Sequence, residues 1–112
     1  PVLLVAYDVP YPAPLAAVRA IDALFATALI LNPTPNAPGL ARLHLHPSTP
    51  DAASSSTAQE STLEHAGLNA LRLAVPAARS LPLLSALARR ESTRLWLPTP
   101  ATTLLAIDLE PV

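Results

Sequence analysis

The sequence predicts an α/β fold on the basis of three features. Two continuous apolar runs, at residues 2–7 and 23–31, have the length and the branched side chains of buried β-strands. A strong helical pattern follows at residues 80–91, together with two further strand-like segments, 94–97 and 102–109. Because the one or two helices on offer cover at most one face of the two apolar strands, we expect the fold to be incomplete in this chain alone.

Proline dominates the connection between the first two predicted strands. The first strand ends at Asp8, and the prolines of residues 9–14 hold the chain near polyproline geometry. Residues 15–22 predict a loop or a short helix, and residues 23–31 predict the second strand. The alternative is a single helix over residues 15–31, because the apolar positions there also come close to helical spacing.

The middle of the chain predicts a strand, a loop and a short helix. A turn cluster at residues 32–39 leads into a third strand at residues 40–46, whose later part alternates apolar and polar side chains. Residues 47–59 are rich in Ser, Thr, Ala and Pro and predict a mobile surface loop. Residues 61–64 have the spacing of a capping box, which predicts the start of a helix that Pro76 interrupts.

The helix predicted at residues 80–91 carries signals at both ends. Ser80 is the expected N-cap, and Pro82 is tolerated in the first turn. Arg89 and Arg90 lie at the carboxyl end, where positive charge opposes the helix dipole. The expected apolar stripe consists of Leu84, Leu87 and Ala88. The two strand-like segments after the helix flank a Pro-Thr-Pro turn and predict a hairpin.

The composition argues against several classes of function. The formal net charge of −1 leaves no positive excess with which to bind a nucleic acid or an anionic membrane. The 112 residues include no Cys, hence no thiolate nucleophile, and only two Gly, too few for a phosphate-binding loop or a dinucleotide fingerprint. No apolar run reaches the roughly 18 residues of a membrane span, and no signal peptide is recognisable. We expect a cytoplasmic protein without a cofactor.

The beginning of the sequence has two interpretations. The chain starts inside the first apolar run, without an initiator Met, a polar lead-in or a helix cap. We expect it to be a piece of a longer protein, and its first partner to be the amino-terminal part of that same protein. The alternative is that Pro1 is a true amino terminus, in which case its secondary amine is available for chemistry.

Three segments of the chain resemble a known family. Residues 1–10, 21–31 and 76–88 are similar to β-ketoacyl-synthase-like proteins of the chain length factor type, which accompany aryl polyene and related type II polyketide pathways. The resemblance extends over nearly the whole chain, and it corresponds to the carboxy-terminal half of a longer polypeptide. We therefore interpret residues 1–112 as the carboxy-terminal portion of one ketosynthase-like domain.

The resemblance implies a thiolase-like layered α/β fold, like the amino-terminal lobe of a ketosynthase, with residues 2–7 and 23–31 as adjacent central strands. Active ketosynthases use a Cys nucleophile with two His, whereas this chain has no Cys and its three His lie outside the ketosynthase motifs. No catalytic, cofactor-binding or metal-binding residue is therefore assigned. The implied role is that of a non-catalytic subunit, which forms a heterodimer with an active β-ketoacyl synthase and meets the acyl carrier protein only indirectly.

Two histidines on the third predicted strand are a candidate metal site. His44 and His46 stand two residues apart, so they face the same side of a strand, a geometry that can chelate zinc. A third ligand would have to come from His65, Asp8 or a distant carboxylate. Since Arg42 shares the same face, a solvated strand face is the better interpretation, and we predict no metal.

A small tautomerase is the alternative function. In such enzymes an amino-terminal Pro acts as general base, because a partly desolvated secondary amine near Arg can have its pKa lowered toward neutrality. Here Pro1 would take that role, and Arg19 or Arg42 would bind a substrate carboxylate. The interpretation requires a β-α-β unit made of residues 2–8, 15–31 and 40–46.

The remaining polar and aromatic residues give weaker signals. Ser54, Ser55, Ser56 and Ser61 precede His65 and Glu64, but no Gly-x-Ser-x-Gly elbow surrounds them, so a flexible Ser-rich loop is expected. Asp8 follows a strand and either orients a ligand or closes a turn. Arg94 and Trp96 suit an interface, although a half-buried Trp is the more frequent outcome.

Overall fold

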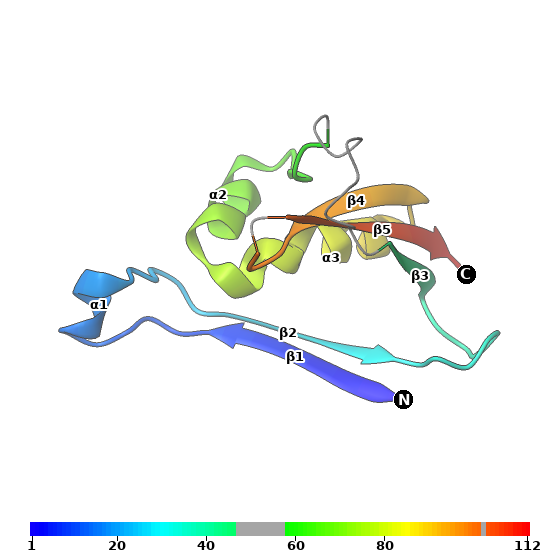
Figure 1. Ribbon diagram of the computed structural model, residues 1–112, viewed down its shortest axis with the longest axis horizontal. Coiled ribbons are helices and arrows are strands. Elements are labelled where there is room, and N and C mark those ends of the chain that lie inside the picture. The colour runs from blue at the N-terminus through cyan, green and yellow to red at the C-terminus, as the bar shows by residue number, and fades with distance from the viewer. Residues whose placement is uncertain (47–57, 102) are drawn as a thin grey trace. The chain divides into compact units, whose positions relative to one another are not determined.

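The computed structural model describes residues 1–46, 58–101 and 103–112 (Figure 1). Of the predicted loop at residues 47–59, residues 47–57 lie outside the described part of the chain. The elements in chain order are β1 (Val2–Asp8), α1 (Leu15–Val18), β2 (Phe25–Leu31), β3 (Ala41–His46), α2 (Ala66–Ala74), the 3₁₀ helix η2 (Pro76–Ser80), α3 (Leu81–Arg89), β4 (Thr93–Pro98) and β5 (Leu104–Pro111).

These elements form a small mixed α/β protein with two antiparallel sheets, which confirms the predicted mixture of helices and strands. The chain divides into two compact units, residues 1–38 with 64–79 and residues 39–63 with 80–112. One sheet belongs to each unit. No helix in the described parts of the chain is long and apolar enough to cross a membrane.

The first unit contains a two-stranded ribbon, formed by β1 and β2 side by side (Figure 1). The strands are antiparallel along their full length, with Val2 opposite Leu31 and Asp8 opposite Phe25. Both predicted strands are confirmed. The alternative of one long helix is wrong, because only Leu15–Val18 is helical before the chain turns into β2.

Helix α2 of the first unit begins later than the capping-box spacing predicts. Its N-cap is His65, whose Nδ1 accepts a hydrogen bond from the backbone N–H of Leu68 at 3.2 Å. Ser61 is not the cap, because its side chain is engaged elsewhere by the backbone of Trp96. The helix ends at Ala74, in agreement with the predicted interruption at Pro76, which begins η2.

The second unit contains a three-stranded sheet in the order β3-β5-β4, antiparallel throughout. β4 and β5 form the predicted hairpin, with Leu97 opposite Leu105 and Thr93 opposite Leu109. β3 pairs with the other edge of β5, so β5 is the central strand. The backbone N–H of Ser61 donates to the carbonyl of Trp96 at 2.9 Å, which continues pairing on the outer side of β4.

Helix α3 packs against β4 and β5 of this sheet. Its buried residues are Pro82, Leu83 and Ala86, so the predicted stripe of Leu84, Leu87 and Ala88 is wrong. Leucines occupy adjacent positions in this helix, and the sequence pattern alone does not select which of two neighbouring stripes faces the sheet. The helix has Pro82 in its first turn as predicted, but Ser80 makes no side-chain cap bond.

The apolar core of the second unit lies between α3 and one face of the sheet. Its buried residues come from the helix and from both hairpin strands: Leu83, Ala86, Leu95, Ile107 and Leu109. Leu109 is the most deeply buried of these, at 1% exposed, because it lies on the central strand. The second unit therefore has one sheet face that is covered within the chain itself.

Candidate functional site

The most unusual surface of the described chain is the ribbon formed by β1 and β2. Side chains alternate between two faces along each strand, and residues opposite one another share a face. One face, which we call the open face, consists of Leu3, Val5, Tyr7, Ala26, Ala28 and Ile30. All six residues are exposed, and none carries a charge.

The second face of the ribbon is also apolar and partly exposed. It consists of Val2, Leu4, Ala6, Asp8, Phe25, Thr27, Leu29 and Leu31. Val2 and Leu4 are exposed, whereas Phe25 and Leu29 are half-buried. The sequence pattern of a strand covered on both faces is thus present, but within the described chain neither face is fully covered.

The open face is large for a surface without a partner. Its four large side chains, Leu3, Val5, Tyr7 and Ile30, are between 53% and 77% exposed. They present roughly 450 Å² of apolar area, comparable with the largest patches on monomeric proteins, which are often functional. Removing that area from water would contribute about 10 kcal/mol, against an association cost of about 4–15 kcal/mol. The ribbon is therefore suited to binding another apolar surface.

The edges of the ribbon are open as well. Among the described residues, β1 and β2 form a sheet with each other alone, so each strand keeps one edge without a neighbouring strand. Soluble proteins normally protect such edges with charges, prolines or a covering segment. The ribbon carries a single charged side chain, Asp8, at its end.

Asp8 holds the end of the ribbon to another part of the first unit. Its Oδ2 accepts a hydrogen bond from the backbone N–H of Ala77, at 2.6 Å. Ala77 is the second residue of η2, where a helix leaves N–H groups without internal partners. Asp8 is therefore part-buried and structural in this unit, which agrees with a role in closing a turn rather than with one in binding a ligand.

The three-stranded sheet presents a different kind of surface opposite its core. Arg94 of β4 and His46 of β3 both contact Asp108 of the central strand β5. Arg94 Nη2 donates to Asp108 Oδ2 at 2.7 Å while its Nε donates to Oδ1, and His46 Nε2 donates to Oδ2 at 2.7 Å. This cluster, which we call the clamp, joins all three strands.

The chemistry of the clamp is that of a surface ion pair. The hydrogen bond from Arg94, and then that from His46, holds the pKa of Asp108 well below its ordinary value of 3.8. An aspartate bound by a guanidinium on both oxygens is a poor base, and two of its neighbours on this face, Ala106 and Trp96, have no nucleophilic side chain. The clamp is consistent with strand registration rather than with catalysis.

The histidine pair is arranged as predicted, but its surroundings are those of an ion pair. His44 lies directly opposite Asp108 on the same face, while His46 contacts it diagonally. No group of three His, Asp or Glu side chains in the described part of the chain is placed to hold a metal ion. His65 is engaged as the cap of α2, and Asp8 binds Ala77.

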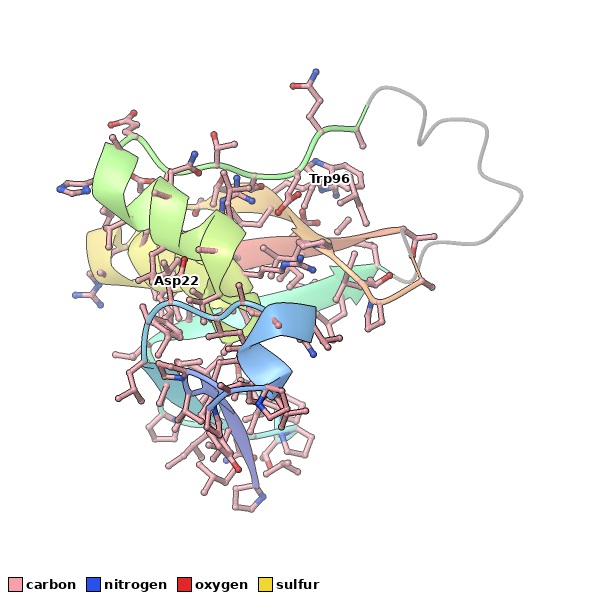
Figure 2. The ribbon with its side chains drawn as sticks, turned by 90° about the vertical axis from the view of Figure 1, so that its left-hand side faces the viewer. Asp22 and Trp96 are labelled. Atoms are coloured by element: carbon pink, nitrogen blue, oxygen red, sulfur yellow. The ribbon has the colours of Figure 1, made fainter. Side chains whose placement is uncertain are left out.

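The β-α-β unit required by the tautomerase alternative does not form. Residues 25–31 are a strand that runs antiparallel to β1, and β3 belongs to the other sheet. Pro1 is exposed at one end of the ribbon. Arg19 and the exposed Asp22 (Figure 2) lie in the connection at the opposite end, roughly 20 Å away along a seven-residue strand. No arginine is thus positioned beside Pro1 by the ribbon.

The other candidate residues serve local structure. Ser61 Oγ accepts a hydrogen bond from the backbone N–H of Trp96 at 2.8 Å, so Ser61 fastens a segment to the edge of β4. Trp96, labelled in Figure 2, is half-buried as predicted. Ser54, Ser55 and Ser56 lie outside the described residues. Asp108 and its clamp were not predicted from the sequence, where the only signal was an acidic residue within an apolar strand.

Comparisons with the models of known protein families, with curated proteins and with solved structures found no match. The fold therefore defines the class of this protein no further than a small mixed α/β protein with two antiparallel sheets. Its distinguishing feature is the exposed ribbon with its uncharged open face, and an interaction surface is the interpretation that this feature favours.

Proposed function

We propose that the chain is a non-catalytic, ketosynthase-like subunit of the chain length factor type. It pairs as a heterodimer with an active β-ketoacyl synthase in polyene, polyketide or fatty-acid-like chain elongation, in the cytoplasm. The observation that carries the proposal is the ribbon, whose two strands are apolar on both faces and remain exposed within the described chain. Strands of this kind are typical of the interior of layered α/β folds.

In this proposal the ribbon becomes internal when other polypeptide covers it. The amino-terminal part of the same protein completes a thiolase-like layered fold, and the ketosynthase subunit binds the completed domain. The acyl carrier protein is met only through the ketosynthase. The resemblance of residues 1–10, 21–31 and 76–88 to chain length factors supports this arrangement.

The polar groups of the chain support a binding role rather than a catalytic one. The sequence contains no Cys, so the nucleophile of a condensing enzyme has no counterpart here. Among the described residues, Asp108 is the one carboxylate whose pKa is strongly lowered, and both of its oxygens are occupied by Arg94 and His46. Its environment keeps it ionised and unreactive, as a structural aspartate requires.

Affinity purification from the native host tests this function. The protein, tagged in its native host so that its amino-terminal part is retained, is expected to recover a β-ketoacyl synthase in a 1:1 ratio, identified by mass spectrometry. Val5→Lys, which places a charge on the open face, is expected to lower that recovery at least tenfold. Leu45→Lys, at an exposed leucine of β3 in the other sheet, is the matched control and is expected to retain the ketosynthase. Recovery of no ketosynthase would contradict the proposal.

A further inference from the structure

The two strands of the ribbon contribute side chains of different size to the open face, so one side of this face stands higher than the other. β1 contributes the large side chains Leu3, Val5 and Tyr7, which we call the high row. β2 contributes Ala28 opposite Val5 and Ala26 opposite Tyr7, which we call the low row. At two successive levels of the ribbon, a large side chain thus stands directly beside a methyl group.

We propose that two copies of this chain bind each other through their open faces when no other partner is present. A two-fold axis parallel to the strands turns one ribbon over and exchanges its left and right sides. β1 of each copy then lies over β2 of the other, while the level along the strands is unchanged. The high row of each copy therefore sits on the low row of its partner.

The same two-fold axis gives both copies the same set of contacts. Tyr7 of one copy lies over Ala26 of the other and Val5 lies over Ala28, and the reciprocal contacts follow by symmetry. Pairing large with small side chains fills the spacing of about 10 Å between packed sheets. At the third level Leu3 lies over Ile30, at the end of the ribbon, where packed sheets diverge because each is twisted.

Charge and area favour a second copy over other occupants. The open face has no charged side chain, so it offers nothing to phosphate groups of a nucleic acid or of a lipid headgroup. Two copies together bury roughly 900 Å² of large apolar side chain plus the contributions of Ala26 and Ala28, which brings the interface to about 1,000 Å², the lower limit of a specific one. We therefore infer a dimer of micromolar rather than nanomolar affinity.

This inference is independent of the proposed function, because it concerns residues 1–112 alone, without the polypeptide that the proposal places over the ribbon. Sedimentation equilibrium of the purified chain between about 1 and 100 µM is expected to show a reversible dimer. Val5→Lys and the uncharged Ala28→Phe, which fills the low row, are each expected to raise the dimer Kd at least tenfold. Leu45→Lys is the control and is expected to leave the Kd unchanged.

The orientation is tested by cross-linking, which the chain permits because it has no Cys of its own. Val5→Cys and Ala28→Cys are introduced into separate copies with different tags and treated with a short bifunctional thiol reagent. Cross-linked product is expected mainly between the two different variants, since position 5 of one copy lies over position 28 of the other. Equal cross-linking of each variant with itself would overturn the proposed axis.

The outcomes separate this inference from the function. A chain that is monomeric up to 100 µM overturns the dimer and leaves the pairing with a ketosynthase untouched. A dimer that Leu45→Lys disrupts and Val5→Lys does not also overturns it, because the interface then belongs to the other sheet. Circular dichroism confirms that each variant is folded, and the two open-face variants provide independent tests should one of them fail to fold.

Discussion

The two sheets of this protein differ in how their faces are shielded from water. The β3-β5-β4 sheet covers one face with α3 and makes the other face polar, with an ion-pair cluster that spans its three strands. The β1-β2 ribbon has two apolar faces, both open to solvent in the described chain. A sheet of the first kind is stable by its own contacts, whereas one of the second kind requires contacts supplied by another surface.

The largest effect is expected when a leucine of each sheet is replaced by alanine. Leu109→Ala removes a leucine that is 1% exposed and is expected to lower the free energy of unfolding by about 3 kcal/mol. Leu3→Ala removes one that is 63% exposed and is expected to cost less than about 0.5 kcal/mol. Urea unfolding at submicromolar concentration, where a dimer of micromolar affinity is dissociated, measures both. Equal losses would mean that the ribbon is covered in solution.

Hydrogen exchange sharpens the comparison at the level of the backbone. Amides of β5 bond to a strand on each side, and they are expected to exchange at least about a hundredfold more slowly than the amides of β1 and β2. Pairing of two open faces stacks the ribbons without bonding their edges, so it leaves outward-facing amides unprotected. Slow exchange throughout β1 would instead indicate that another strand adds to the ribbon edge.

A third prediction concerns the helix that accompanies the ribbon in the first unit. His65→Ala removes the side chain that accepts the N–H of Leu68 and is expected to destabilise α2 by about 1 kcal/mol. His65→Ser keeps an acceptor at the N-cap and is expected to restore the loss. Helicity measured by circular dichroism during thermal unfolding distinguishes the two variants. If His65→Ser behaved like His65→Ala, the imidazole would act through packing rather than as a cap.

The smallest effect is expected at the clamp of the three-stranded sheet. Because the folded-state pKa of Asp108 lies below the unfolded one, its contribution to stability is present above about pH 4 and is lost as the pH falls toward the folded pKa. Asp108→Asn is expected to lower stability slightly at neutral pH and to flatten this acid dependence. The clamp is exposed, so added salt should reduce the difference between the two proteins. Parallel acid titrations of stability would contradict the assignment.

Much of the secondary structure was predictable, because it depends on local patterns. The runs that form β1 and β2, the hairpin of β4 and β5 and the helix that begins near Ser80 are all recognisable in the sequence. The failures have tertiary causes. Ser61 has the spacing of a cap but is bound by the backbone of Trp96, and His65, a less common N-cap, takes its place.

The candidate site was predictable in composition but not in geometry. The apolar runs indicated a surface that needs covering, yet their pattern did not reveal which residues share a face, because both faces are apolar. Only the pairing of Val5 with Ala28 and of Tyr7 with Ala26 defines the high and low rows. The clamp likewise depends on three residues, His46, Arg94 and Asp108, that are distant in sequence and meet through strand order alone.

The hydrogen bond of Asp8 has a consequence for how the ribbon is aligned. In most sheets a slip of one residue is prevented because it would turn apolar side chains out to water. Here such a slip would exchange one apolar face for another, so hydrophobicity offers little resistance to it. Moving β1 by one residue would, however, carry the Asp8 carboxylate to the opposite side, away from the N–H of Ala77. The hydrogen bond of Asp8 at the end of the ribbon thus fixes the register of β1, and the register decides which row of side chains meets a partner.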